Sequence, residues 1–282
     1  MRTTDHESQL YMTLKKTALC SLLATWVYLP ALFSAEIAFN FESETADDTA
    51  PPSGWSLVST AGTATYKVTS AGLGSNGSGG SAGLAGQVSS DAYLKTNLPG
   101  GYLVNNTVFD VTQNITGSFD IYALNEATSD DVVMVFGNIG SGFAGNTKND
   151  FLSAKFLEGS GDDVLADSDN TSLNSYTTPG FTNDTWVHAT FSWTPTSGNT
   201  GNFSITLKNF GPTTISELSK TGYTFTSSAA QFGFGSVNDT VRFDNIYIIP
   251  EPASLALFAL GLSGLLGLSR FGSRSSGAST KS

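Results

Sequence analysis

Histidine, the side chain most suited to proton transfer near neutral pH, occurs once between residues 36 and 249, as His188. A Ser/His/Asp triad would have to use it. The one Gly-x-Ser-x-Gly match, residues 79–83, lies in a Gly/Ser-rich segment and not in a strand-turn-helix elbow. The sequence has no histidine pair for zinc and no Glu-x-Asp-x-x-Glu strand for a glycosidase. The only cysteine, Cys20, lies in an N-terminal apolar segment, so the rest of the chain has no thiol nucleophile. We expect a non-enzymatic protein; a carbohydrate-active enzyme with an unrecognised acid pair is the alternative.

Two carboxylates, Glu42 and Asp244, lie near opposite ends of the region that we expect to fold. If the first and last strands are neighbours, these groups and backbone carbonyls could bind a structural Ca²⁺, which prefers hard oxygen ligands. A salt bridge from Arg242 is an equally supported alternative, and no cofactor follows with certainty. The four aspartates of segment 162–169 lack the spacing of a calcium-binding loop and indicate a solvated acidic loop.

Glycan binding needs flat aromatic rings exposed in a groove, because the apolar faces of sugars stack on them. Candidate rings stand in turns or at polar strand positions, where core or edge packing is the competing role. They are Trp55, Tyr102, Tyr176 and Trp186.

The charge of residues 36–249 restricts the partners. Seven Lys or Arg stand against 21 Asp or Glu, a formal difference of −14. Such a surface repels nucleic acid and anionic lipid and favours solubility. We therefore expect no nucleic-acid partner.

Short β-rich segments separated by Gly, Pro, Asn and Ser clusters predict an all-β protein. Residues 186–193 alternate strictly, with Val187, Ala189, Phe191 and Trp193 on one face, as in a sheet with one face on the core. No long helical pattern is present in this region. We predict one domain, residues 36–249, folded as a jelly-roll-type two-sheet sandwich, with the Gly/Ser-rich segment 72–86 as an internal loop.

The last predicted strand contains an irregularity. Its apolar positions change phase from Val241 and Phe243 to Ile246 and Ile248. This shift predicts a β-bulge near Asp244. Residues 39–42, at the start of the domain, should form the neighbouring strand.

The N-terminus has the parts of a secretory signal. Lys15 and Lys16 precede an apolar segment, residues 17–33, and small residues follow at 34–35. We assign residues 1–35 to a signal peptide; Met12 is an alternative start that would give it a conventional basic region.

The C-terminus predicts membrane insertion. Pro250, Glu251 and Pro252 end the folded region, since proline continues neither a strand nor a helix. Residues 253–269 are apolar with no charge, just long enough to cross a bilayer, and Arg270 and Arg274 begin a basic tail. We predict a single C-terminal transmembrane helix.

This order of Pro-Glu-Pro, apolar helix and basic end over residues 250–282 resembles the PEP-CTERM sorting signal of Gram-negative bacteria. The resemblance implies exosortase as a partner, with the tripeptide as its recognition element. It also implies transient anchoring in the inner membrane, then transfer to the cell surface or extracellular matrix. A permanently anchored, unprocessed protein is the competing interpretation.

The body is similar, in short pieces, to concanavalin A-like and laminin G-like sandwiches. The pieces include 185–190 (Thr-Trp-Val-His-Ala-Thr) and 242–248 (Arg-Phe-Asp-Asn-Ile-Tyr-Ile). Galactose-binding-like jelly rolls share similar ends and are the second possibility. The resemblance implies the sandwich architecture. We expect a non-catalytic lectin-like module that binds exopolysaccharide; a purely structural matrix component is a further alternative.

Overall fold

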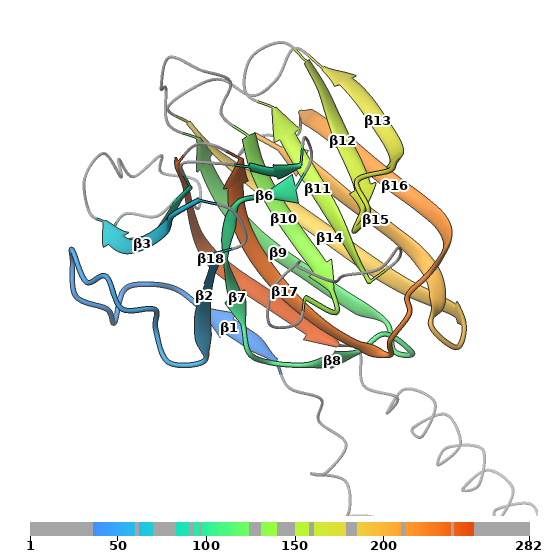
Figure 1. Ribbon diagram of the computed structural model, residues 1–282, viewed down its shortest axis with the longest axis horizontal. Coiled ribbons are helices and arrows are strands. Elements are labelled where there is room, and N and C mark those ends of the chain that lie inside the picture. Colours follow the sequence, from blue (N-terminus) through green and yellow to red (C-terminus); the bar gives the residue numbers. More distant parts are fainter. Residues whose placement is uncertain are drawn as a thin grey trace, which may run out of the picture. The chain divides into compact units, whose positions relative to one another are not determined.

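The chain folds as two antiparallel β-sheets packed face to face (Figure 1), which confirms the all-β, jelly-roll-type sandwich. This computed structural model describes residues 36–59, 62–69, 83–90, 93–95, 98–123, 131–139, 150–157, 161–178, 185–209, 213–237 and 240–250. Among these residues there is no helix.

The first sheet has, in spatial order, β16 (Thr214–Thr224), β15 (Thr200–Lys208), β14 (Trp186–Ser197), β9 (Ile115–Ala123), β18 (Thr240–Pro250), β4 (Ala85–Ser90) and β3 (Ala64–Thr69), with β1 (Ile37–Phe39) also paired to β18. The second has β13 (Ser172–Thr178), β12 (Gly161–Asp167), β11 (Phe151–Leu157), β10 (Asp131–Gly137), β17 (Ala229–Val237), β7 (Gly101–Asn105) and β2 (Trp55–Ser59), with β8 (Phe109–Asp110) paired to β17. The short strands β5 (Tyr93–Lys95) and β6 (Leu98–Pro99) form a separate pair.

Aromatic side chains fill the space between the sheets. Phe191 of β14 stacks on Phe232 of β17, with ring centroids 5.4 Å apart, and Phe234 stacks on Phe243 of β18 at 4.5 Å. The predicted inward face of β14 is buried at every position from Val187 to Trp193. Burial of such side chains contributes about 1.5–3 kcal/mol each and makes this layer the main source of stability.

The first and last strands of the domain are neighbours, as predicted, although the first strand covers Ile37–Phe39 and residues 40–42 lie in the turn that follows it. Ile37 of β1 lies opposite Ile248 of β18, and Phe39 lies opposite Ile246. Because the two strands are antiparallel, the chain enters and leaves the sandwich at the same end. The predicted bulge is also present: the pairing of β18 with β9 shifts between Asp244 and Tyr247, and Asn245 takes a left-handed φ of 49°.

The residues Ala35–Glu251 form one compact unit. The predicted signal peptide (1–35), transmembrane helix (253–269) and basic tail, with Arg270 and Arg274, lie outside the described residues. So do Glu251 and Pro252. Within the part that the structure describes, no helix is long and apolar enough to cross a membrane.

Candidate functional site

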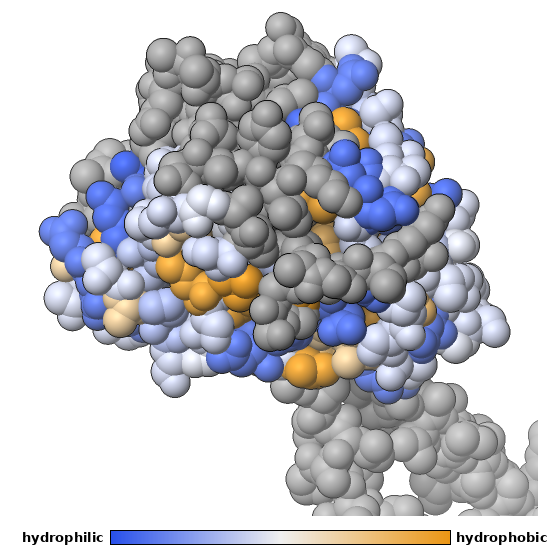
Figure 2. Space-filling view, viewed as in Figure 1, coloured by the Kyte–Doolittle hydropathy of each residue, from blue (hydrophilic) through white to orange (hydrophobic). Residues whose placement is uncertain are grey.

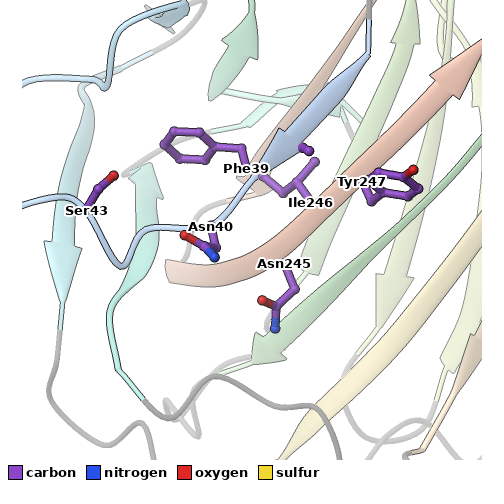
Figure 3. Close-up of a pocket in the computed structure, with 7 residues that line it drawn as sticks. Phe39, Asn40, Ser43, Asn245, Ile246 and Tyr247 are labelled. Atoms are coloured by element: carbon purple, nitrogen blue, oxygen red, sulfur yellow. The ribbon is translucent and has the colours of Figure 1, made fainter.

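A hollow of about 420 Å³ opens on the outer face of the first sheet, where β1 meets β18. Figure 3 shows that its walls come from these two strands and the turn after β1. The lining residues are Ala38, Phe39, Asn40, Ser43, Asn245, Ile246 and Tyr247. Among the described residues on the face in Figure 2, hydrophilic ones surround small separate hydrophobic areas.

Tyr247 is the aromatic side chain that this hollow presents to solvent, with 42% of its surface exposed. It points outward because Ile246 and Ile248, on either side, point into the core. The pKa of Tyr247 is raised, first by partial desolvation and then by its hydrogen bond to Glu36 and the charge of that carboxylate. Its phenol is therefore a neutral hydrogen-bonding group at physiological pH.

The hollow connects to a hydrogen-bond network on β9 and β14. The Asn245 Nδ2 amide donates to Asp120 Oδ2 over 2.8 Å, and His188 Nδ1 lies 2.7 Å from Asp120 Oδ1. Asp120 is 2% exposed, whereas the His188 side chain is 38% exposed. One buried carboxylate thus fixes both the amide that lines the hollow and an imidazole that reaches the surface.

The bulge explains why Asn245 lines the hollow. In regular β-structure successive side chains alternate between faces, so Asn245 would point opposite to Asp244. The left-handed conformation at Asn245 instead lets this exposed side chain reach Asp120 on the outer face. Asparagine tolerates this conformation better than most residues.

A second group of side chains lies further along the same outer face. Arg242 Nε donates to Gln87 Oε1 over 3.0 Å, and its guanidinium carbon lies 5.5 Å from the centroid of the Tyr122 ring. Tyr122 packs in turn against Trp186. All of these except Gln87 are buried, so this group supports the sheet instead of presenting a surface.

The structure corrects three of the four aromatic rings predicted to stack on glycan. Trp55, Tyr102 and Trp186 are 5%, 0% and 3% exposed, and a buried ring offers no face to a sugar. Tyr176 on β13 is exposed at 39%, as the prediction requires, and it lies outside the residues that line the hollow.

The two predicted calcium ligands, Glu42 and Asp244, differ in their exposure to solvent. Glu42 is exposed, and its Oε1 accepts the backbone N–H of Leu84 over 3.2 Å. Asp244 is 1% exposed. Among the described residues, no group of three or more His, Cys, Asp or Glu could hold a metal ion. The Ca²⁺ site formed by this pair stays a prediction, and an unchanged melting temperature in EDTA would exclude it.

The acidic segment 162–169 differs from the predicted solvated loop. Residues 161–167 form the strand β12, in which Asp163 and Asp167 are 2% and 0% exposed. Asp167 Oδ1 accepts the backbone N–H of Thr171 over 2.8 Å. This carboxylate stabilises the turn that leads to β13.

Pro250 is the last residue of β18 and lies opposite Ile115 of β9. The predicted sorting motif therefore begins at the final position of the sandwich.

No protein-family model and no curated protein sequence matches the chain. Three solved structures have a similar fold. An alginate lyase from Aplysia kurodai has 15% identity, 60% coverage of this chain and 84% of its own, and a TM-score of 0.40. An endo-β-1,4-glucuronan lyase from Trichoderma reesei has 12% identity, with 77% coverage of this chain and 95% of its own, and a TM-score of 0.41. The Emp47p carbohydrate recognition domain has 10% identity, with 78% coverage of this chain and 97% of its own, and a TM-score of 0.46. Similarity at this level carries over neither a substrate nor a reaction.

Proposed function

We propose that the chain is an exported surface or matrix protein whose sandwich binds a glycan in the hollow between β1 and β18, without cleaving it. The observation that supports this proposal is the exposed ring of Tyr247 in a hollow that also presents Asn40, Ser43 and Asn245. A flat ring stacks on the apolar face of a sugar, while amide and hydroxyl groups pair with its hydroxyls. The network through Asp120 holds one of those amides in place before the ligand arrives.

The proposal also includes the way in which the protein is exported and processed. Exosortase would act on Pro250, Glu251 and Pro252 after the predicted helix 253–269 has entered the inner membrane. Two features of the fold suit such processing: Pro250 ends the last strand, and the chain enters and leaves the sandwich at one end. A cut beyond Pro250 would remove no strand of the sandwich.

A carbohydrate-active enzyme is the second candidate, and the pairing of His188 with Asp120 favours it. The contact of His188 Nδ1 with Asp120 Oδ1, at 2.7 Å, fixes the orientation of the imidazole ring. An oriented, partly exposed imidazole is the arrangement that a general base requires. In the binding proposal, the same pair only supports Asn245.

A glycan array combined with a turnover assay separates these functions. We expect the full-length chain, in a non-ionic detergent without sugar groups, to bind at least one glycan and to release no product. Tyr247→Ala should abolish binding, while the matched exposed variant Tyr176→Ala should retain it. Product that disappears in His188→Ala would establish the enzyme instead. Neither binding nor turnover would leave a purely structural role.

A further inference from the structure

A line of hydroxyl side chains continues from the hollow across the outer face of the first sheet. Ser118 of β9 lies opposite Tyr247 of β18, and Thr190 of β14 lies opposite Ser118. Thr206 of β15 lies in turn opposite Thr190. Directly paired residues of antiparallel strands project from the same face of a sheet. The register therefore aligns these three residues, which we call the hydroxyl row, with the ring of Tyr247.

The hydroxyl row faces solvent. A buried core residue adjoins each of its members along the strand: Phe119, Ala189 and Ile205. Because side chains alternate between the two faces of a strand, the hydroxyls point outward. Thr190 is exposed, and Ser118 and Thr206 are half-buried. A ligand in the hollow can therefore reach the row without any movement of the sheet.

The hydroxyls of the row are available to a ligand. In the next line of side chains on the same face, Ser192 Oγ and Ser204 Oγ lie 2.9 Å apart and are hydrogen-bonded to each other. Among the described residues, no side-chain bond of this kind occupies Ser118, Thr190 or Thr206. Their hydroxyls can therefore donate to and accept from the hydroxyls of a bound sugar.

Charged groups lie at the margins of the hydroxyl row and not within it. Glu217 of β16 lies opposite Thr206, at the end away from the hollow. His188 and Lys208, which lie opposite each other, flank the row two positions along β14 and β15. The described residues that line the hollow are also uncharged. Hollow and row together thus suit the hydroxyl groups of an uncharged sugar chain.

We propose that the hollow and the hydroxyl row bind one extended, uncharged polysaccharide, whose chain crosses the strands from Tyr247 toward β15. This inference rests on the proposed glycan site and specifies the charge and the length of its ligand. A pyranose unit of an extended chain covers a distance similar to the strand spacing of about 4.8 Å, so about four units reach from Tyr247 to Thr206. The ring of Tyr247 stacks on the first unit, and the hydroxyls of the row pair with the units that follow.

The test is a length series. Titration calorimetry measures the affinity of the full-length chain, in sugar-free, non-ionic detergent, for β-1,4-linked oligomers of glucose, mannose and N-acetylglucosamine with two to six units. A uronate hexamer is the charged comparison. We expect at least one neutral series to bind, with an affinity that rises about two- to tenfold per added unit up to about four units and then levels off. The uronate hexamer should bind more weakly than the neutral hexamer.

Two threonines on one strand assign this gain to the hydroxyl row. Thr190→Ala should weaken binding of the tetramer about two- to tenfold, and it should not affect the dimer, which ends before β14. Thr194→Ala removes the same type of side chain from an exposed position on β14 beyond the row, and it should change neither affinity. The thermal melting curve of each variant checks that it is folded.

The outcomes separate this inference from the function beneath it. If the dimer binds as tightly as the tetramer, or Thr190→Ala leaves the tetramer unaffected, the inference is wrong and the glycan site stands. The same holds if no neutral series binds while another glycan on the array does. If no glycan binds at all, or Tyr247→Ala retains full binding, both are wrong.

Discussion

At the scale of single residues, the site depends on Asp120. This carboxylate is almost fully buried and is hydrogen-bonded both to the amide of Asn245 and to the ring of His188. Replacing this carboxylate removes two hydrogen bonds from the folded state, although both donors are exposed enough to bond to water instead. The cost should therefore appear both in stability and in glycan binding.

We predict that Asp120→Ala lowers the free energy of unfolding by about 0.5–1.5 kcal/mol per hydrogen bond lost, because water can reach both donors once the carboxylate is removed. Urea denaturation measures the change, with Thr190→Ala, an exposed position on β14, as the control. The variant should also bind glycan more weakly, because Asn245 is no longer fixed. An unchanged unfolding midpoint would mean that the network is not formed in solution.

Three buried tyrosines should make the folded state less stable at alkaline pH. Burial is the largest cause that raises the pKa values of Tyr66, Tyr102 and Tyr223 above the ordinary 10.0, and nearby carboxylates add to it for Tyr66 and Tyr223. A raised pKa in the folded state means that the native protein holds these protons more tightly than the unfolded chain does. Their contribution to stability is complete below pH 10 and is lost as the pH rises further.

We therefore predict cooperative unfolding above pH 10, with the tyrosine absorbance near 295 nm rising in step with the loss of β-sheet circular dichroism. Ionisation of all tyrosines near pH 10, with the sheet signal intact, would contradict the burial of these three rings.

The sequence alone predicted the bulge beside the site, but not the role of Tyr247 or the contact between His188 and Asp120. The order of apolar residues in the last strand predicted the bulge, because the apolar positions change phase after Asp244 in the sequence. Tyr247 was not among the predicted stacking rings, although its place between two isoleucines indicated an outward position. The bond between His188 and Asp120 depends on which strands are neighbours, and alternation within one strand carries no such information.

At the scale of elements, β4 is constrained by close packing. A Cβ on Gly86 would lie 2.5 Å from the ring of Phe41 and 2.9 Å from that of Phe243. These two rings pack edge to face with centroids 5.6 Å apart. Glycine is thus required where the turn after β1 and the strand β18 both press against β4.

We predict that Gly86→Ala destabilises the sandwich by about 1–3 kcal/mol, the usual cost of overpacking a core. Thermal melting measures it, and Thr65→Ala, exposed on the neighbouring strand β3, should change stability by less than about 0.5 kcal/mol. Equal melting temperatures for the two variants would be evidence against this packing.

Strand positions were largely predictable and strand order was not. The alternating segment of β14 and the apolar positions of β18 appear where the sequence placed them. The order of each sheet follows from how its hydrophobic faces pack together, and many orders satisfy the same alternation. Trp186 shows the limit of the pattern: its position on the polar face of β14 suggested exposure, yet it packs against Tyr122 and Ala85.

At the scale of the whole molecule, the proposal joins an acidic sandwich to two terminal signals. Mass spectrometry of the form recovered outside the cells should find a chain that begins near Glu36 and ends near Glu251. Export of a chain that still reaches Ser282 would contradict processing at the Pro-Glu-Pro motif. Deletion of residues 253–282 is the matched control, because it removes the helix and leaves every described strand.

Hydrogen–deuterium exchange with and without glycan is the measurement that addresses the central claim most directly. It uses the full-length chain and the tightest ligand found on the array. We predict slower exchange in peptides that cover residues 38–43 and 244–248, and no change in peptides that cover β13. Protection that appears around Tyr176 or elsewhere, and leaves residues 38–43 and 244–248 unaffected, would contradict a glycan site between β1 and β18.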